Sequence, residues 1–225
     1  MIEAEWSYIE GRRLFSVSVT TPATGDIAQE AERSLAAGVA ALIAAGLRPE
    51  NIVRSRLFTH DRDSRQQASD VRRLRLGGAL RGASSSFWDQ ARLPADSRLR
   101  IDLTAMESPP DDEQIVEYTP AIAPPKFVRL GGLVFLSGVT DITPGLGAQV
   151  AAIRGSIRAS LDDAGTDLRA ARLVSIFLAR EEDPRAALEL VAKHFPEAGC
   201  PVFLTQVGGY SAPEKRIEIE VTATG

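Results

Sequence analysis

One acidic and one basic residue hold matching places in two similar segments of the chain. Glu218 lies in RIEIEVTA, residues 216–223, and Arg100 lies in LRIDLTA, residues 99–105. A carboxylate in a cleft can orient a water molecule or remove its proton, and a guanidinium can bind an anion. Strict alternation of apolar and polar residues predicts a β-strand for each segment. The same alternation fits residues that simply face solvent or a nearby charge, so both interpretations stay open.

Cys200 is the single cysteine of the chain, and it precedes Pro201 at the start of an expected strand. A nucleophilic thiol needs a base or a lowered pKa, and no spacing links His60 or His194 to it. Cys200 therefore either lines a cleft or is a small buried apolar residue. One cysteine and two distant histidines predict no zinc site, and the lack of a disulfide suits a reducing cytosol.

A run of hydroxyls, residues 84–86, precedes Phe87 and Trp88 and could hydrogen-bond a polar ligand or simply form part of a strand. The segment TPGLGAQ, residues 143–149, lacks the lysine and the spacing of a phosphate-binding loop. No dinucleotide fingerprint or triad spacing occurs either. The sequence therefore predicts no cofactor.

The elements that must position these residues occur twice, at a period of about 119 residues. Residues 28–46 and 148–165 both open with Ala-Gln and close with Ala-Gly, which predicts long helices that end at glycine. An apolar strand, a second helix and a closing alternating strand follow in each half. The predicted order is β-β-α-β-α-β-β per half, an α+β chain of two tandem domains whose helices pack on one face of a mixed sheet.

The segment between the halves begins with the acidic, proline-bearing ESPPDDEQ, which is typical of a linker. We place the first domain at residues 1–106, the linker at 107–125 and the second domain at 126–225.

The net charge of −4 favours neither nucleic acid nor an anionic membrane surface as a partner. An arginine-rich stretch at residues 62–75 is interpreted as the solvated face of an amphipathic helix. No signal peptide and no segment long enough to span a bilayer are apparent, so a cytoplasmic location is expected.

Three motifs resemble the RidA/YjgF (reactive intermediate deaminase) family: GGLVFLSGVT at residues 131–140, RIEIEVTA at 216–223 and ARLP at 91–94. The resemblance covers nearly the whole chain, with one family domain in each half. It implies a trimeric, barrel-like assembly with a site in each cleft between neighbouring domains. It also implies hydrolysis of enamines and imines, with an arginine on the substrate carboxylate and a glutamate that positions water.

Both halves depart from that pattern at the family arginine. Its position falls on Ser85 in half one and on Phe203 in half two, or on Pro201 if two residues are inserted. The family glutamate position is Arg100 in half one and Glu218 in half two. We therefore expect the pockets to lack the guanidinium that would hold a substrate carboxylate.

The expected catalytic residue is thus Glu218. The expected substrate-binding residues are Ser85, Arg100, Cys200, Phe203, Ser137 and Gly138. The predicted function is processing of a reactive imine, enamine or related labile small molecule, without a metal or cofactor. A chorismate-cleaving hydrolase, whose known examples also join two such domains, and a non-catalytic ligand-binding protein are the alternatives. A homo-oligomer, either a trimer or a pseudo-trimer of such domains, is expected.

Overall fold

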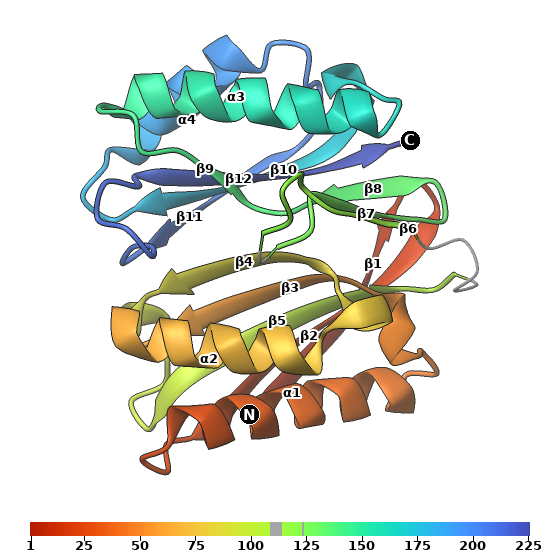
Figure 1. The fold of residues 1–225 in the computed structure, drawn as a ribbon, viewed down its shortest axis with the longest axis vertical. Helices are drawn as coiled ribbons and strands as arrows, with labels where there is room; N and C mark the ends of the chain where they lie inside the picture. Colours follow the sequence, from red (N-terminus) through yellow and green to blue (C-terminus); the bar gives the residue numbers. More distant parts are fainter. Residues whose placement is uncertain (109–113, 123) are drawn as a thin grey trace.

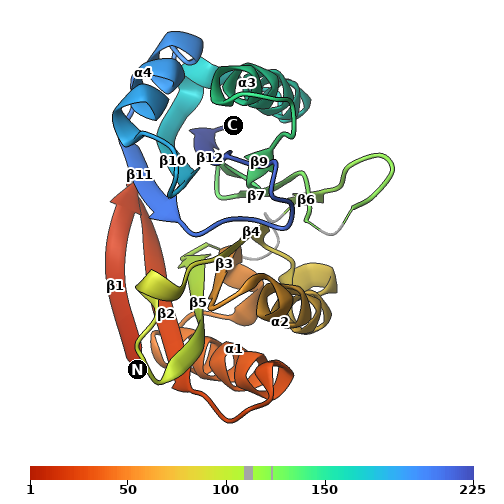
Figure 2. The same ribbon diagram turned by 90° about the vertical axis from the view of Figure 1, so that its left-hand side faces the viewer.

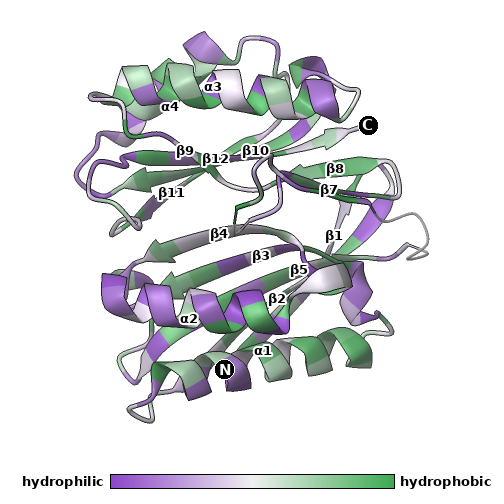
Figure 3. Ribbon diagram, viewed as in Figure 1, coloured by the Kyte–Doolittle hydropathy of each residue, from purple (hydrophilic) through white to green (hydrophobic). Residues whose placement is uncertain are grey.

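Two α/β layers are stacked with their sheets facing each other and their helices outside (Figure 1). The structure is a computed structural model, and it describes residues 1–108, 114–122 and 124–225. Figure 3 shows the arrangement in terms of hydropathy, with apolar residues along the strands and many hydrophilic residues on α2. In the described part of the chain, no helix has both the length and the apolar character needed to cross a bilayer.

Half one forms a five-stranded sheet in the order β1-β2-β5-β3-β4, in which only β3 and β4 run parallel. Its main elements are β1 (Ile2–Ile9), β2 (Arg12–Pro22), α1 (Ile27–Ala44), β3 (Ile52–Thr59), α2 (Arg62–Arg75), β4 (Ala83–Trp88) and β5 (Ser97–Met106). Asp61 caps α2 by accepting a hydrogen bond from the Ser64 amide at 2.7 Å.

Half two forms a second sheet in the order β11-β10-β12-β8-β7-β6, in which β10 and β11 run parallel and β9 pairs with β12. Its main elements are β6 (Gln114–Val116), β7 (Phe127–Leu130), β8 (Leu133–Leu136), β9 (Val139–Thr140), α3 (Leu146–Asp163), β10 (Ala171–Ala179), α4 (Pro184–His194), β11 (Val202–Val207) and β12 (Ile217–Thr224). Asp183 caps α4 and Pro184 lies in its first turn, a pair of residue types that favours the start of a helix.

The predicted duplication and fold class are confirmed, because both halves run through the same order of strands and helices. The mixed sheet of each half has its two helices on one face. The short strand β6 lies inside the segment 107–125 that we expected to be a linker, and it pairs with β7. The exact domain boundaries stay a prediction.

Alternation along each closing strand divides its side chains between two environments. On β5, Leu99, Ile101 and Leu103 are fully buried in the core of half one. Burying a leucine or isoleucine side chain stabilises a fold by about 1.5–3 kcal/mol. The alternate residues, Arg100 and Asp102, therefore face away from the helices, toward the other sheet.

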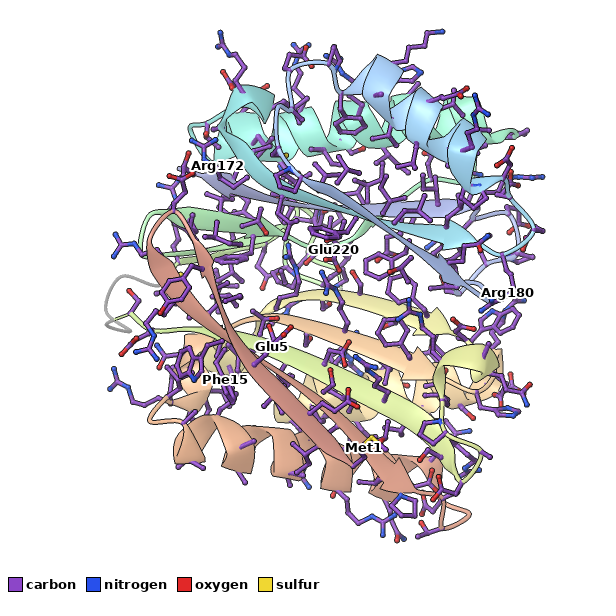
Figure 4. The ribbon with its side chains drawn as sticks, turned by 180° about the vertical axis from the view of Figure 1, so that it is seen from behind. Met1, Glu5, Phe15, Arg172, Arg180 and Glu220 are labelled. Atoms are coloured by element: carbon purple, nitrogen blue, oxygen red, sulfur yellow. The ribbon has the colours of Figure 1, made fainter. Side chains whose placement is uncertain are left out.

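Two apolar clusters join the facing sheets and leave a polar zone between them. One contains Ala83, Val128 and Phe135, and the other contains Phe87 and residues of half two. Ser85 lies between Ala83 and Phe87 on the same side of β4, so its hydroxyl is in the polar zone. Glu220 lies in this zone between the two sheets (Figure 4).

The hairpin of β1 and β2 also connects the halves. Figure 2 shows β1 extending along the open side of the molecule toward β11. At the hairpin turn, Glu10 forms an ion pair with Arg172 of β10 at 2.5 Å. The pair is partly exposed, so it contributes about 1 kcal/mol at most.

Candidate functional site

A cavity of about 530 Å³ lies where α2 and β4 of half one meet β9 and the start of β12 of half two. Both halves are needed to form it. Its size suits a small molecule, since ligand pockets typically measure about 300–1,000 Å³. Its polar and charged wall includes Arg65, Arg72, Ser85, Lys215 and Glu218, and Gly138 lies beside them.

Glu218 forms part of the cavity wall and is only 6% exposed. Its neighbours on β12, Ile217 and Ile219, are buried in the core of half two, so alternation turns Glu218 toward half one. Burial, with a further contribution from the charge of Glu220, raises the pKa of Glu218 to about 7. Its Oε1 atom is buried and has no hydrogen-bond partner among the described residues. Glu218 is therefore equipped to donate a proton near neutral pH.

Gly138 allows the carboxyl group of Glu218 to lie against the backbone. A Cβ atom at Gly138 would lie 1.8 Å from Glu218 Oε1 and 2.4 Å from Ser85 Oγ. The glycine interrupts the strand between β8 and β9, and its amide donates to the Ser84 carbonyl at 3.2 Å. Ser137 accepts from the Ser84 amide at 3.0 Å. These bonds hold β4 of half one against the interrupted strand of half two.

Glu220, two residues along β12, is a buried carboxylate with several donors. Arg56 donates to it from Nη2 at 2.6 Å, Arg54 Nε lies 3.2 Å away, and Ser85 Oγ donates at 2.6 Å. Burial alone would raise the pKa of Glu220, but the charges of Arg56 and Arg54 and these hydrogen bonds lower it to about 2. At neutral pH Glu220 is therefore ionised, whereas Glu218 keeps its proton in about half of the molecules.

The cavity contains a guanidinium, and the prediction that it would lack one is wrong. Arg72 of α2 is 8% exposed, and it donates to the carbonyl of Ser85 at 2.7 Å and to Ser86 Oγ at 2.6 Å. Burial lowers the pKa of Arg72 to about 10, which leaves it charged at neutral pH. The interpretation of residues 62–75 as a fully solvated arginine face is wrong for the same residue.

The spacing of buried residues on α2 could have predicted that Arg72 points inward. Ser64, Ala68 and Arg72 are the buried residues of this helix, and they follow one another at intervals of four. Two small residues at that spacing mark the face that packs on the sheet, so the arginine that continues it must turn inward. A comparison of positions along β4 alone could not find Arg72, because this side chain reaches Ser85 from the helix α2.

Sequence reasoning also missed Glu220, Arg54 and Arg56. Alternation on β12 places Glu220 on the same face as Glu218, and alternation on β3 places both arginines on one face. Charged residues that repeat at intervals of two on central strands are rare unless they are paired. That pattern was the available signal for a buried ionic network.

The remaining predicted residues lie outside the cavity wall. Arg100 pairs with Asp102 at 2.7 Å and donates to Ser18 Oγ at 2.8 Å. Cys200 packs against the core of half two, and burial raises the pKa of its thiol. Phe203 is 63% exposed on the edge strand β11. The structure therefore brings together Glu218, Ser85 and Gly138, with Ser137 beside them. Arg100, Cys200 and Phe203 lie elsewhere.

Strand registers show which residues of the halves correspond. Ser85 is paired with Arg56 on the neighbouring strand, as Phe203 is paired with Ser175. Arg100 is likewise paired with Phe58, and Glu218 holds the matching place on β12 opposite Phe177. The ungapped correspondence of Ser85 with Phe203 and of Arg100 with Glu218 agrees with these registers.

The segment before β7 provides an apolar wall to the cavity through Tyr118, Ile122, Pro124 and Pro125. Arg81 hydrogen-bonds Glu117 and the carbonyl of Ile122, which fixes this segment over half one. The cavity therefore combines cationic and apolar surfaces. Among the residues that the structure describes, no group of three or more His, Cys, Asp and Glu side chains is placed to hold a metal ion.

No protein-family profile matches the chain, and no curated protein does. Among solved structures, a chorismatase shares 13% identity and a TM-score of 0.66, and the match covers 98% of this chain and 79% of that one. A YjgF-family member from Mycobacterium tuberculosis shares 24% identity and a TM-score of 0.46, over 50% of this chain and 99% of its own. A YjgF-family protein from Neisseria meningitidis shares 24% identity and a TM-score of 0.42, over 50% of this chain and 94% of its own. The chorismatase match covers nearly the whole chain and supports the predicted two-domain fold.

Proposed function

We propose that the chain is an enzyme that hydrolyses a small, carboxylate-bearing enamine or imine, with Glu218 as the general acid. One observation carries the proposal: Glu218 is a buried carboxyl on the cavity wall with a pKa near 7, and its Oε1 has no hydrogen-bond partner within the described parts of the chain. A general acid works best when its pKa lies near the operating pH. Perturbed carboxyls in cavities are typical of catalytic sites.

The chemistry needs one proton to be given and one to be taken back. Protonation of the enamine carbon by Glu218 produces an iminium ion and leaves the Glu218 carboxylate. Water then adds to the carbon that bears nitrogen and loses a proton to that carboxylate, which restores the acid. The resulting carbinolamine expels ammonia and leaves a ketone, so the sum is enamine plus water giving ketone plus ammonia.

Cations on the same wall supply the recognition of a carboxylate. Arg72 lies beside Ser85, and Arg65 and Lys215 also line the cavity. Charge-assisted hydrogen bonds from such groups to a carboxylate are about twice as strong as neutral ones. We propose that they take the place of the family arginine that neither β4 nor β11 provides.

A second candidate differs only in the heteroatom of the substrate. Protonation of an enol ether at its terminal carbon, followed by water addition and loss of an alcohol, uses the same acid and the same water. The likeness to a chorismatase over 98% of this chain favours this candidate, because chorismate is an enol ether with two carboxylates. The site would hold it through the same cationic wall.

Both candidates are tested with the purified chain. Enamines generated in situ are followed by ammonia release, and chorismate by the loss of its ultraviolet absorbance. We expect turnover of one class and a loss of about 10²–10⁴-fold in Glu218→Gln, the usual contribution of a general acid. Glu189→Gln removes an exposed carboxylate of α4 and should change nothing. Rates equal to buffer for every substrate, or full activity of Glu218→Gln, would refute the proposal.

A further inference from the structure

We propose that Ser85 is a positioning residue that donates its only proton to Glu220 and accepts a hydrogen bond from protonated Glu218. In that arrangement the serine favours the acid form of Glu218, the form that the proposed function requires. The catalytic importance of this role for Ser85 thus rests on the proposed function. Its geometry is independent of any substrate.

The proton of Ser85 is committed to Glu220. The Oγ–Oε1 distance of 2.6 Å is that of a strong hydrogen bond to a charged acceptor. Glu220 is held as a carboxylate by Arg54 and Arg56, and it is 1% exposed. A carboxylate can only accept, so the serine must be the donor in this pair.

Glu218 lies within reach of the other side of the same hydroxyl. Glu218 Oε1 and Ser85 Oγ both crowd the point where a side chain at Gly138 would begin, at 1.8 Å and 2.4 Å from it. The two oxygens are therefore no more than about 4 Å apart, so a small adjustment brings them to hydrogen-bond distance. Since Oε1 has no other partner among the described residues, it is the oxygen that can carry the acid proton toward Ser85.

The charges around the serine favour one direction for this bond. Ser85 has no second proton to offer, so an ionised Glu218 would face a lone pair of Oγ and the charge of Glu220 behind it. Two carboxylates on adjacent same-face positions of one strand do not both ionise readily in a buried site. Arg54 and Arg56 stabilise the ionised form of Glu220. Because Ser85 donates to that carboxylate, it can only accept a hydrogen bond from Glu218, which favours the protonated form of Glu218.

In the opposite arrangement Ser85 would donate to Glu218 and lower its pKa, but the 2.6 Å bond to Glu220 already uses the single proton of the serine. That arrangement makes the opposite prediction. Removal of an acceptor destabilises the neutral form of Glu218 and lowers its pKa, whereas removal of a donor raises it. The direction of change in Ser85→Ala therefore distinguishes the two. Ser84→Ala, one residue away on β4, is the matched control because no hydrogen bond joins the Ser84 hydroxyl to either carboxyl among the described residues.

The experiment is a carbon-13 NMR titration of glutamate side-chain carboxyls, with the Glu218 signal assigned by its loss in Glu218→Gln. In Ser85→Ala we expect the Glu218 midpoint to fall by about half a pH unit or more, and in Ser84→Ala to stay unchanged. If Ser85→Ala does not fold, Ser85→Cys keeps the size of the side chain and replaces the hydroxyl by a weak acceptor, so its midpoint must fall as well. A midpoint that rises or does not move in the folded variant overturns the inference.

Activity separates this inference from the proposed function. A lower Glu218 midpoint in Ser85→Ala, together with no turnover of any substrate, supports the serine's role and refutes the enzyme proposal. Turnover that depends on Glu218, with an unchanged midpoint in Ser85→Ala, does the reverse. Where both hold, the pH at which kcat/KM begins to fall should move with the midpoint.

Discussion

Glu218→Gln should make the protein more stable in mildly alkaline solution while it removes the proposed acid. In the unfolded chain Glu218 ionises near its ordinary pKa of 4.5, whereas burial holds its pKa near 7 in the fold. Well below pH 4.5 Glu218 is neutral in both states, so its ionisation takes nothing from the free energy of unfolding. As the pH rises toward 7 the unfolded state releases its proton first, so the free energy of unfolding falls.

The size of the loss follows from the two pKa values. Each pH unit between 4.5 and about 7 corresponds to about 1.4 kcal/mol, which gives about 3 kcal/mol in all. Glu218 is only 6% exposed, so solvent does little to screen this cost. The glutamine variant is neutral at every pH and avoids the loss. Part of this loss has already occurred at pH 5, so the advantage of the variant over the wild type should grow by about 2.5 kcal/mol between pH 5 and pH 8.

Urea unfolding of the wild type and Glu218→Gln at pH 5, 6, 7 and 8 measures this difference directly. Glu189→Gln serves as the control, since its exposed carboxylate should give a flat difference over the same range. A difference between wild type and Glu218→Gln that stays constant from pH 5 to pH 8 would show that Glu218 ionises normally in the fold. The acid role proposed for it would then lose its physical basis.

Three further substitutions test other parts of the site. Glu220→Gln leaves the buried Arg54 and the partly buried Arg56 without their carboxylate, so it should lower the free energy of unfolding at pH 7 by about 3 kcal/mol or more in a urea titration. Because the pKa of Glu220 is lowered to about 2, the wild type should keep this contribution above pH 4.5 and lose it only as the pH falls toward 2. Gly138→Ala places a methyl group 1.8 Å from Glu218 Oε1, so we expect a loss of about 1–3 kcal/mol and a shifted Glu218 titration; an unchanged urea midpoint would contradict the close contact. Arg72→Met should raise KM at least about tenfold for a carboxylate substrate but not for its neutral amide, as measured by initial rates.

Local rules in the sequence were sufficient to predict the fold. Asp183 and Pro184 mark the start of a helix wherever the chain is placed, because capping is a property of one turn. The alternation of Leu99, Ile101 and Leu103 likewise defines a strand with one buried face. Such signals repeat at the same spacing in both halves, so the duplication could be predicted as well.

The site depends on contacts between residues that are far apart in the sequence, and no local sequence rule predicts such contacts. Arg72 reaches β4 because α2 lies across that strand, and Arg54 meets Glu220 because two sheets face each other. The sequence was sufficient to predict Glu218 as a candidate residue. It was not sufficient to predict the raised pKa of Glu218, because that pKa depends on burial by half one and on the charge of Glu220. These electrostatic effects arise where the two halves meet, and the sequence of either half alone does not contain them.

Glu218 and Arg100 hold corresponding positions in the two halves, and a single neighbouring residue makes their surroundings differ. Where half two has Glu218 against Gly138, half one has Arg100, whose guanidinium donates to Ser18 at 2.8 Å. The glycine leaves room for a carboxyl to stay unpaired at a cavity, whereas the serine provides a partner that satisfies the arginine.

The third pair of positions separates the halves further. Ser85 faces the buried network of half two, while its counterpart Phe203 is exposed on an edge strand. A hydroxyl can bridge two carboxyls, and a phenyl ring cannot. Ser85 stands where the resemblance implies an arginine, and we propose that it links the acid Glu218 to its charged neighbour Glu220. At this position we therefore expect control of a proton, and not the substrate binding that the resemblance implies for an arginine.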